Sequence, residues 1–177
     1  MRIVVFGAGS LGSLLGALLD SAHDVVLVGR DPHVSAVRER GLRVTGVDSF
    51  EASPAATTDG TGLDADLAIV TVKAYDTAAA AHDLATGDVD AAVSLQNGLG
   101  NEETLAAGLV CPIVAGTTTH GAMLSEPGVV EWTGRGAVAV GNWRVDGAGD
   151  HTPQVDATDD PASRVAAAFR AASIDAA

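Results

Sequence analysis

The chain has 177 residues, of which 47% are hydrophobic and 3% aromatic, and its formal net charge at pH 7 is −13. This length is enough for one domain whose core is built from Val, Leu, Ile and Ala. An acidic surface of this kind repels nucleic acids and anionic membranes, so we expect neither as a partner. No apolar run approaches the roughly 20 residues that a membrane-spanning helix needs.

The N-terminus and the cysteine content favour a cytoplasmic protein. Residues 2–6 form a short apolar run without the longer apolar region and cleavage site of a signal peptide. Cys111 is the single cysteine, which excludes an internal disulfide and suits a reducing compartment. The histidines lack metal-ligand spacing and there is no Cys/His cluster, so we expect no metal.

The acidity of the chain has two explanations. Asp and Glu number 23 against 10 Lys and Arg. One explanation is adaptation to molar salt, where the Debye length falls to about 3 Å and repulsion between carboxylates is screened. The other is a GC-rich genome, which favours Asp, Ala, Gly and Arg codons. We favour adaptation to salt.

Strands and helices alternate through the first two thirds of the chain. The apolar pattern predicts strands over residues 2–6, 24–29, 66–73, 91–97 and 112–117, and helices over 10–21, 32–40, 77–85 and 101–108. Residues 42–60 are ambiguous: 42–46 can form a strand, and the rest is typical of a loop. Because the strands are continuous apolar runs, the sequence predicts an α/β fold with a Rossmann-type, doubly wound, mostly parallel sheet.

The rhythm changes near residue 128. Residues 128–133 and 137–141 predict an antiparallel hairpin around a Gly-Arg-Gly turn. Residues 146–160 are typical of a polar, acidic loop. Asp160 as cap and Pro161 at the first position then predict a final helix. We expect residues 1–177 to form a single domain.

The segment FGAGSLG, residues 6–12, spells G-x-G-x-x-G between a strand and a helix. This context is the one that a dinucleotide-binding fingerprint requires. Gly7 permits the tight turn, Gly9 lets a pyrophosphate touch the backbone, and Gly12 lets helix and strand pack closely. The helix N-terminus offers free N–H groups to the phosphates. The predicted phosphate-binding residues are Gly7, Ala8, Gly9, Ser10, Leu11 and Gly12.

The end of the second strand bears on which dinucleotide binds. NAD-binding folds usually carry an acidic residue there, which binds the ribose 2′-hydroxyl. Here Gly29 and Arg30 hold the last strand positions. Since a guanidinium matches phosphate geometry, Arg30 favours NADP(H). Asp31 leaves NAD open, because its carboxylate would favour NAD if it turned inward.

Two polar residues follow later strands at the same edge of the sheet. Lys73 is the only lysine of the chain and follows a central strand, where its ammonium can bind cofactor or substrate oxygens. Asn97 ends the next strand and can bind the nicotinamide ribose or a substrate oxygen, although Asn-Gly is also a common turn. For His120 we favour a structural hydrogen bond over catalysis, since no acidic residue stands beside it in sequence.

Several motifs occur in one order: FGAGSLG, VGR at residues 28–30, VKAYDT at 72–77, QNGLGNEE at 96–103, AGTTTHGA at 115–122 and PGVVEWTGRGAVAVG at 127–141. Together they resemble the ketopantoate reductases (2-dehydropantoate 2-reductases). That family reduces 2-dehydropantoate, a 2-oxo acid, to pantoate with NADPH, on the way to pantothenate and coenzyme A.

The resemblance implies a role for each matched residue. Gly7–Gly12 bind the pyrophosphate region, and Arg30 favours the 2′-phosphate. Lys73 contacts NADPH, Asn97 lies at the junction of cofactor and substrate, and Ala122 lines the nicotinamide side.

The family has a helical second domain, which we do not expect within these 177 residues. In the family that domain carries the lysine that protonates the new alkoxide and most substrate contacts. We expect this lysine to lie beyond Ala177 and the 177 residues to be the cofactor-binding half, inactive alone. The apolar surface that this leaves can also lead to a homodimer.

Two other functions stay open. One is a different NAD(P)-dependent dehydrogenase of 2-oxo or 3-hydroxy acids that shares this first domain. The other is a non-catalytic domain that senses NAD(P).

If the acidity is an adaptation to salt, the unfolding temperature of the chain rises between dilute buffer and about 1 M KCl, because salt screens the repulsion among its carboxylates. Thermal unfolding followed by circular dichroism at increasing KCl measures this. An unfolding temperature that does not respond to KCl would leave genome composition as the explanation.

Overall fold

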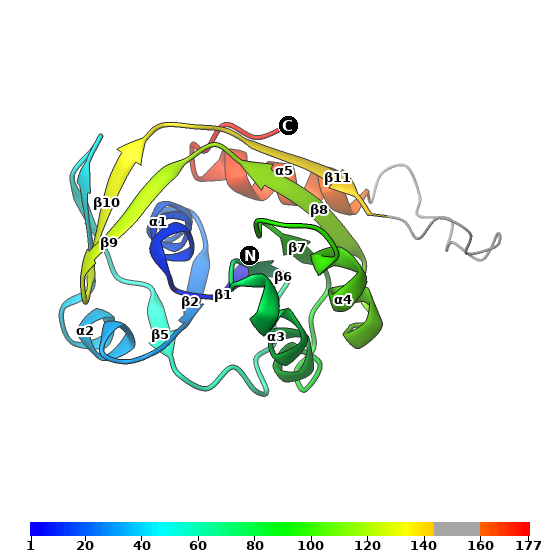
Figure 1. Ribbon diagram of the computed structural model, residues 1–177. Helices are drawn as coiled ribbons and strands as arrows, with labels where there is room; N and C mark the ends of the chain where they lie inside the picture. Colours follow the sequence, from blue (N-terminus) through cyan, green and yellow to red (C-terminus); the bar gives the residue numbers. More distant parts are fainter. Residues whose placement is uncertain (144–159) are drawn as a thin grey trace.

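The computed structural model describes residues 1–143 and 160–177, in which two sheets and the helices that cover them are seen (Figure 1). The larger sheet has the strand order β11-β8-β7-β6-β1-β2-β5 and the smaller sheet has the order β4-β3-β10-β9. The larger sheet consists of β1 (Arg2–Phe6), β2 (Asp24–Val28), β5 (Ala55–Thr57), β6 (Leu67–Val70), β7 (Ala92–Ser94), β8 (Ile113–Thr118) and β11 (Val138–Asn142). The smaller one consists of β3 (Leu42–Gly46), β4 (Phe50–Ala52), β9 (Gly121–Glu126) and β10 (Val129–Gly134). The helices are α1 (Ser10–Leu19), α2 (His33–Arg40), α3 (Thr77–Leu84), α4 (Asn101–Gly108) and α5 (Pro161–Ala171), with a short 3-10 helix, η1 (Ala74–Asp76).

The larger sheet confirms the α/β, Rossmann-type prediction. Every pairing from β5 through β2, β1, β6 and β7 to β8 is parallel. The chain starts at β1 in the middle, moves outward to β5, and returns to build β6, β7 and β8 on the other side. This order is that of a doubly wound dinucleotide-binding sheet.

Both faces of the larger sheet are covered. Along β1, Ile3 and Val5 belong to a core shared with α1, α5 and the smaller sheet, whereas Val4 and Phe6 belong to a core shared with α3 and α4. The alternation follows from the two-residue period of a strand. Because both sets of side chains are buried, the strand is apolar throughout, and this is why its sequence showed no polar alternation.

The predicted hairpin around Gly134-Arg135-Gly136 is wrong. β10 pairs antiparallel with β9 and parallel with β3 in the smaller sheet, whereas β11 pairs antiparallel with β8 in the larger one. The hairpin turn lies instead at Pro127-Gly128, where Gly128 has φ +79°. Proline followed by a residue with positive φ is the signature of a type II turn.

The strands from 113 to 142 form one long antiparallel ribbon that passes from the larger to the smaller sheet (Figure 1). At the passage, Ala137 N–H donates to Thr119 Oγ1 at 3.0 Å and Gly136 N–H donates to His120 Nδ1 at 3.2 Å. A Cβ at Gly136 would overlap the backbone of Thr119. The glycines between β10 and β11 therefore permit a close crossing and do not make a turn.

The ambiguous stretch 42–60 contains three strands. β3 and β4 pair antiparallel in the smaller sheet, and β5 is the edge strand beside β2. The smaller sheet packs against α1, so that α1 lies between the two sheets. The other predicted elements are confirmed, most of them with shorter ends; the helix predicted over 10–21, for example, ends at Leu19 and the strand over 66–73 ends at Val70.

The last helix begins as predicted. The Asp160 carboxylate accepts a hydrogen bond from Ser163 N–H at 2.8 Å, and Pro161 occupies the first turn. After α5 the chain returns to β11, where Val138 N–H donates to Asp175 O at 2.8 Å. Apart from Asp160, the loop predicted over 146–160 lies outside the described residues. Within the described ranges, no helix has the length and apolar character needed to cross a membrane.

His33, the first residue of α2, is 5% exposed and links α1, α2 and the turn of the ribbon. Gly128 N–H donates to its Nδ1 at 3.0 Å, and its Nε2 lies 3.0 Å from Ser13 Oγ. Since Nδ1 accepts, the proton of the neutral ring is on Nε2, which donates to the Ser13 hydroxyl. Burial lowers the pKa of His33.

This geometry predicts a loss of stability in acid. With the folded pKa of His33 below its ordinary value, the unfolded chain takes up the proton first. The neutral His33 ring contributes its full stabilisation of the folded state above about pH 6.5, the ordinary pKa of histidine. As the pH falls from that value toward the folded pKa, the unfolding free energy decreases by at most about 1.4 kcal/mol per pH unit. His33→Gln lacks this pH-dependent part of the unfolding free energy. The unfolding free energies of the parent and of His33→Gln therefore approach each other as the pH falls from about 7.5 to 5.

Urea unfolding at several pH values measures this difference. The matched control is His82→Gln, which removes an exposed histidine from α3. Parallel pH profiles for the parent and His33→Gln would contradict the prediction.

Candidate functional site

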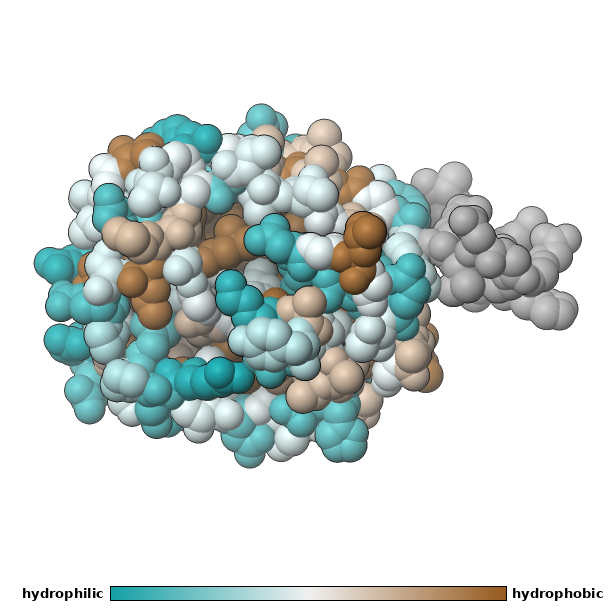
Figure 2. Space-filling view, viewed as in Figure 1, coloured by the Kyte–Doolittle hydropathy of each residue, from teal (hydrophilic) through white to brown (hydrophobic). Residues whose placement is uncertain are grey.

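The predicted site residues follow neighbouring strands at one edge of the larger sheet. In the order β2-β1-β6-β7, the segments after the four strands carry Arg30, Gly7–Gly12, Lys73 and Asn97. Between β1 and β6 the direction of winding reverses, and this is where open α/β sheets bind ligands. Figure 2 shows a hollow near the centre of the face on which α1 is seen end-on in Figure 1, with hydrophilic residues on its rim.

The glycine loop is held tightly on its protein side. Gly7 N–H and Ala8 N–H both donate to Val28 O, at 2.9 and 2.8 Å, and Thr71 Oγ1 donates to Gly7 O at 2.8 Å. Gly7 has φ +118°, and a Cβ there would lie 2.7 Å from Val72 N. A Cβ at Gly12 would overlap the Gly7 carbonyl oxygen. These two glycines are therefore required by the packing of α1 against β1 and β6.

Gly9 differs from its neighbours because its outer side is open. No atom lies within 4 Å of a Cβ built there, and Gly9 caps α1 without any side-chain hydrogen bond to the first turn. The N–H groups of Ser10, Leu11 and Gly12 have no acceptor within the helix, as in the first turn of any α-helix. A backbone cradle with free donors at the positive end of a helix fits a pyrophosphate.

Ser10 and Ala122 connect the loop to the smaller sheet. The Ser10 hydroxyl accepts a hydrogen bond from Leu124 N–H at 3.0 Å, so β9 is fastened to the first residue of α1. Ala122 lies two residues earlier on β9, opposite Trp132 of β10, and is partly buried. The strand that carries Ala122 was not predicted from the sequence, although the TTTHGA motif that contains this residue was identified.

Arg30, which follows β2, forms an ion pair with Asp76. Its guanidinium contacts the Asp76 carboxylate at 3.0 Å, with 83% of the Arg30 side chain exposed. Asp31 does not turn inward: its carboxylate accepts from Ser35 N–H at 3.0 Å and from Ser35 Oγ at 2.7 Å, on α2. These bonds lower the pKa of Asp31.

Lys73 and Asn97 stand on two loops that a buried network joins. Gln96 Nε2 donates to Val72 O at 3.0 Å and to Thr77 Oγ1 at 2.7 Å. Thr77 Oγ1 lies 2.9 Å from Ala74 O and 3.1 Å from Asn101 Oδ1, and Asn101 Nδ2 donates to Asn97 O at 3.3 Å. The network fixes one loop against the other at the crevice.

The side chains of Lys73 and Asn97 themselves are exposed. Among the residues that the structure describes, neither makes a hydrogen bond or ion pair through its side chain. Their polar ends are thus available to a ligand, while their backbones are held. Sequence reasoning did not assign roles to Gln96, Thr77 or Asn101, although all three stand in the quoted motifs VKAYDT and QNGLGNEE.

His120 is placed at the crossing of the ribbon. Its Nδ1 accepts a hydrogen bond from Gly136 N–H, and its ring lies 5.7 Å from that of Trp132. The Arg135 guanidinium lies over the Trp132 ring. Burial, followed by the positive charge of Arg135, lowers the pKa of His120. The structural interpretation made from the sequence agrees with these contacts.

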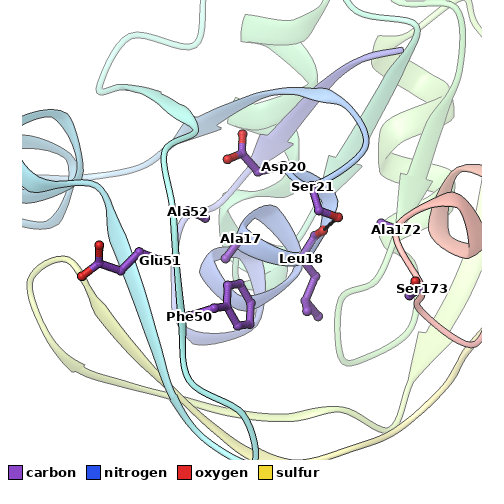
Figure 3. A pocket seen from close by; sticks show the side chains of 9 residues that line it. All are labelled: Ala17, Leu18, Asp20, Ser21, Phe50, Glu51, Ala52, Ala172 and Ser173. Carbon is purple, nitrogen blue, oxygen red and sulfur yellow. Dashed lines mark hydrogen bonds between the residues drawn. The ribbon is translucent and has the colours of Figure 1, made fainter.

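A cavity of about 300 Å³ lies away from this edge, at the far end of α1 (Figure 3). Its lining includes Leu18, Asp20 and Phe50, together with Ala172 and Ser173, which follow α5. Two of the polar side chains there already have protein partners: Asp20 accepts from Ser53 N–H, and the Ser21 hydroxyl donates to Leu18 O. Since α1 spans about 15 Å, this cavity is distinct from the glycine loop.

The strand order, the glycine loop and the polar residues at the reversal define a Rossmann-type domain of the dinucleotide-binding class. The chain belongs to the ketopantoate reductase PanE/ApbA family, whose sequence model matches residues 3–145.

Named relatives and solved structures agree with this family. The 2-dehydropantoate 2-reductase of Pyrococcus horikoshii is 45% identical over 143 residues, which is 80% of this chain and 47% of that protein. The PanE/ApbA family ketopantoate reductase of Ralstonia eutropha JMP134 superposes with a TM-score of 0.82 at 28% identity, over 99% of this chain and 55% of the other. D-Mandelate dehydrogenase with NADH and anilino(oxo)acetate superposes with a TM-score of 0.83 at 25% identity, over 100% of this chain and 56% of the other. The chain thus spans about half the length of the curated relatives that it matches.

Because a side chain has space at Gly9 but not at Gly12, we expect substitution of Gly9 to abolish dinucleotide binding and substitution of Gly12 to lower stability. Gly9→Ser leaves stability unchanged within about 0.5 kcal/mol, because serine is a favoured N-cap residue and has space. Its hydroxyl accepts from one of the first-turn N–H groups and takes up space on the open side of the loop, so dinucleotide binding is lost. Gly12→Ala destabilises by about 1–3 kcal/mol, because its methyl group overlaps the Gly7 carbonyl.

Urea unfolding and dinucleotide titration of both variants measure the two effects. Gly134→Ser is the matched control, because a Cβ there also meets no atom within 4 Å. Unimpaired dinucleotide binding by Gly9→Ser would show that the phosphates do not contact this loop.

Proposed function

We propose that this chain supplies the NADP(H)-binding half of a 2-dehydropantoate 2-reductase, which reduces 2-dehydropantoate to pantoate in the synthesis of pantothenate and coenzyme A. The observation that carries the proposal concerns Lys73 and Asn97, whose exposed side chains make no hydrogen bond or ion pair among the described residues. They stand on loops locked together beside an open glycine cradle. Membership of the ketopantoate reductase family and the names of the archaeal relatives support the substrate. The single cysteine favours a reducing, cytoplasmic location.

Each residue of the edge has a task in this proposal. The nicotinamide cofactor, when bound, supplies the hydride that adds to the ketone carbon. The free N–H groups after Gly9 hold the pyrophosphate, and Arg30 holds the 2′-phosphate. Lys73 and Asn97 bind oxygens of the cofactor ribose and of the substrate. Ala122, a small residue on β9, lines the nicotinamide side without filling it.

The alkoxide that forms from the ketone needs a proton from a general acid at hydrogen-bond distance. His120 is unsuited, because its Nδ1 is used by Gly136 and its Nε2 is buried without contact to solvent. Lys73 is the only lysine and serves the cofactor in this scheme. We therefore expect the 177-residue chain to bind NADPH and to turn over little or no 2-dehydropantoate.

A second candidate function is reduction of another 2-oxo acid. It is favoured by the superposition on D-mandelate dehydrogenase, a protein solved with NADH and anilino(oxo)acetate, which covers the whole of this chain. It differs from the first candidate in substrate and in the preferred dinucleotide. Binding of NADH in preference to NADPH would favour it.

Titration of the chain with NADPH, followed by nucleotide fluorescence, tests the proposal. Lys73→Ala weakens NADPH binding about tenfold, as expected for the loss of one hydrogen bond from a charged group. The matched control is Arg43→Ala, which removes the same charge from an exposed position on β3 in the smaller sheet. NADPH affinity that does not depend on Lys73 would remove this residue from the site, and turnover by the 177-residue chain would contradict the assignment of the proton donor.

A further inference from the structure

The end of β2 delivers no carboxylate to the crevice. At Gly29 a Cβ would lie 2.7 Å from Ala8 Cβ and 3.4 Å from Val34 Cγ2, so an acidic side chain does not fit there without displacement of the loop. Asp31 is fastened to Ser35 of α2 by two hydrogen bonds. Neither residue can act as the acidic group that usually binds the ribose hydroxyls in this class of fold.

Asp76 brings a carboxylate to this place from the opposite side. It is the last residue of η1, which follows β6, whereas Arg30 follows β2. Since β1 lies between β2 and β6, the 3.0 Å contact between Asp76 Oδ2 and Arg30 Nη2 spans the segment that leaves β1, which is the glycine loop. Asp76 also stands at the N-cap of α3 but makes no capping hydrogen bond. Its carboxylate is directed to Arg30 instead.

We propose that Asp76 is the residue that sets the choice between NADPH and NADH, an inference that rests on the proposed function. A 2′-phosphate approaching Arg30 meets a carboxylate that already neutralises the guanidinium and repels the incoming negative charge. A ribose 2′-hydroxyl meets no such penalty and can donate a hydrogen bond to the same carboxylate. Asp76 therefore opposes the preference for NADPH that Arg30 alone would give.

Because the Arg30–Asp76 ion pair is weak, Asp76 lowers the affinity for NADPH but does not prevent NADPH from binding. The Arg30 side chain is 83% exposed and that of Asp76 is 31% exposed. Ion pairs of this kind contribute little to stability and are screened by salt, so a phosphate can displace the carboxylate. Removing the Asp76 charge leaves Arg30 unpaired and free to bind the phosphate.

The test is the ratio of dissociation constants for NADPH and NADH, measured by calorimetry or nucleotide fluorescence in about 0.05 M KCl. Asp76→Asn strengthens NADPH binding about fivefold and does not strengthen NADH binding, because the 2′-hydroxyl loses a charged acceptor. The gain shrinks in about 1 M KCl, because the effect is electrostatic. Arg30→Ala weakens NADPH binding and leaves NADH binding nearly unchanged.

The matched control is Asp24→Asn, which makes the same charge change on β2 at its amino end, far from Arg30. It leaves the ratio of dissociation constants unchanged. An unchanged ratio in Asp76→Asn, with both dinucleotides still bound, would overturn this inference and leave the proposed function standing. Failure of the parent chain to bind either dinucleotide would overturn both.

Discussion

The close contact between α1 and the strands β1 and β6 is the constraint on which the rest of the structure depends. It exists because Gly12 has no side chain to separate the helix from Gly7 and Thr71. The same contact fixes where the first turn of α1 points its free N–H groups. Any residue larger than glycine at position 12 would move the helix and with it the phosphate cradle, the smaller sheet above the helix and the Ser10 contact to β9.

The smaller sheet is a consequence of that placement. α1 is buried on two sides, toward β1 and β2 below and toward the smaller sheet above, which explains why Leu14 and Leu15 are both fully buried. The long ribbon of β8–β11 reaches from one sheet to the other, and the Ser10–Leu124 hydrogen bond holds it to the helix start. Ala122 is positioned by this ribbon, opposite Trp132, and not by the larger sheet.

The polar edge combines rigid backbones with exposed side chains. Gln96, Thr77 and Asn101 are satisfied by one another and by backbone carbonyls, so the loops after β6 and β7 are fixed before a ligand arrives. Such preorganisation lowers the entropic cost of binding. Arg30 is the exception, because its guanidinium is already paired with the Asp76 carboxylate, and under the proposed function a phosphate would have to displace that carboxylate.

Much of the fold and of the candidate site could be read from the sequence, because both follow from local patterns. Continuous apolar strands determined the parallel sheet, the G-x-G-x-x-G spacing determined the turn into α1, and the positions of Arg30, Lys73 and Asn97 after their strands placed them at one edge. The long ribbon could not be read in this way. Gly134-Arg135-Gly136 and Pro127-Gly128 are both acceptable turns, and only the pairing of β10 with β3, some 86 residues away in sequence by the register of Val129 with Arg43, decides between them. The Arg30–Asp76 contact is decided by tertiary structure for the same reason: these residues are 46 positions apart and meet because β1 lies between their strands.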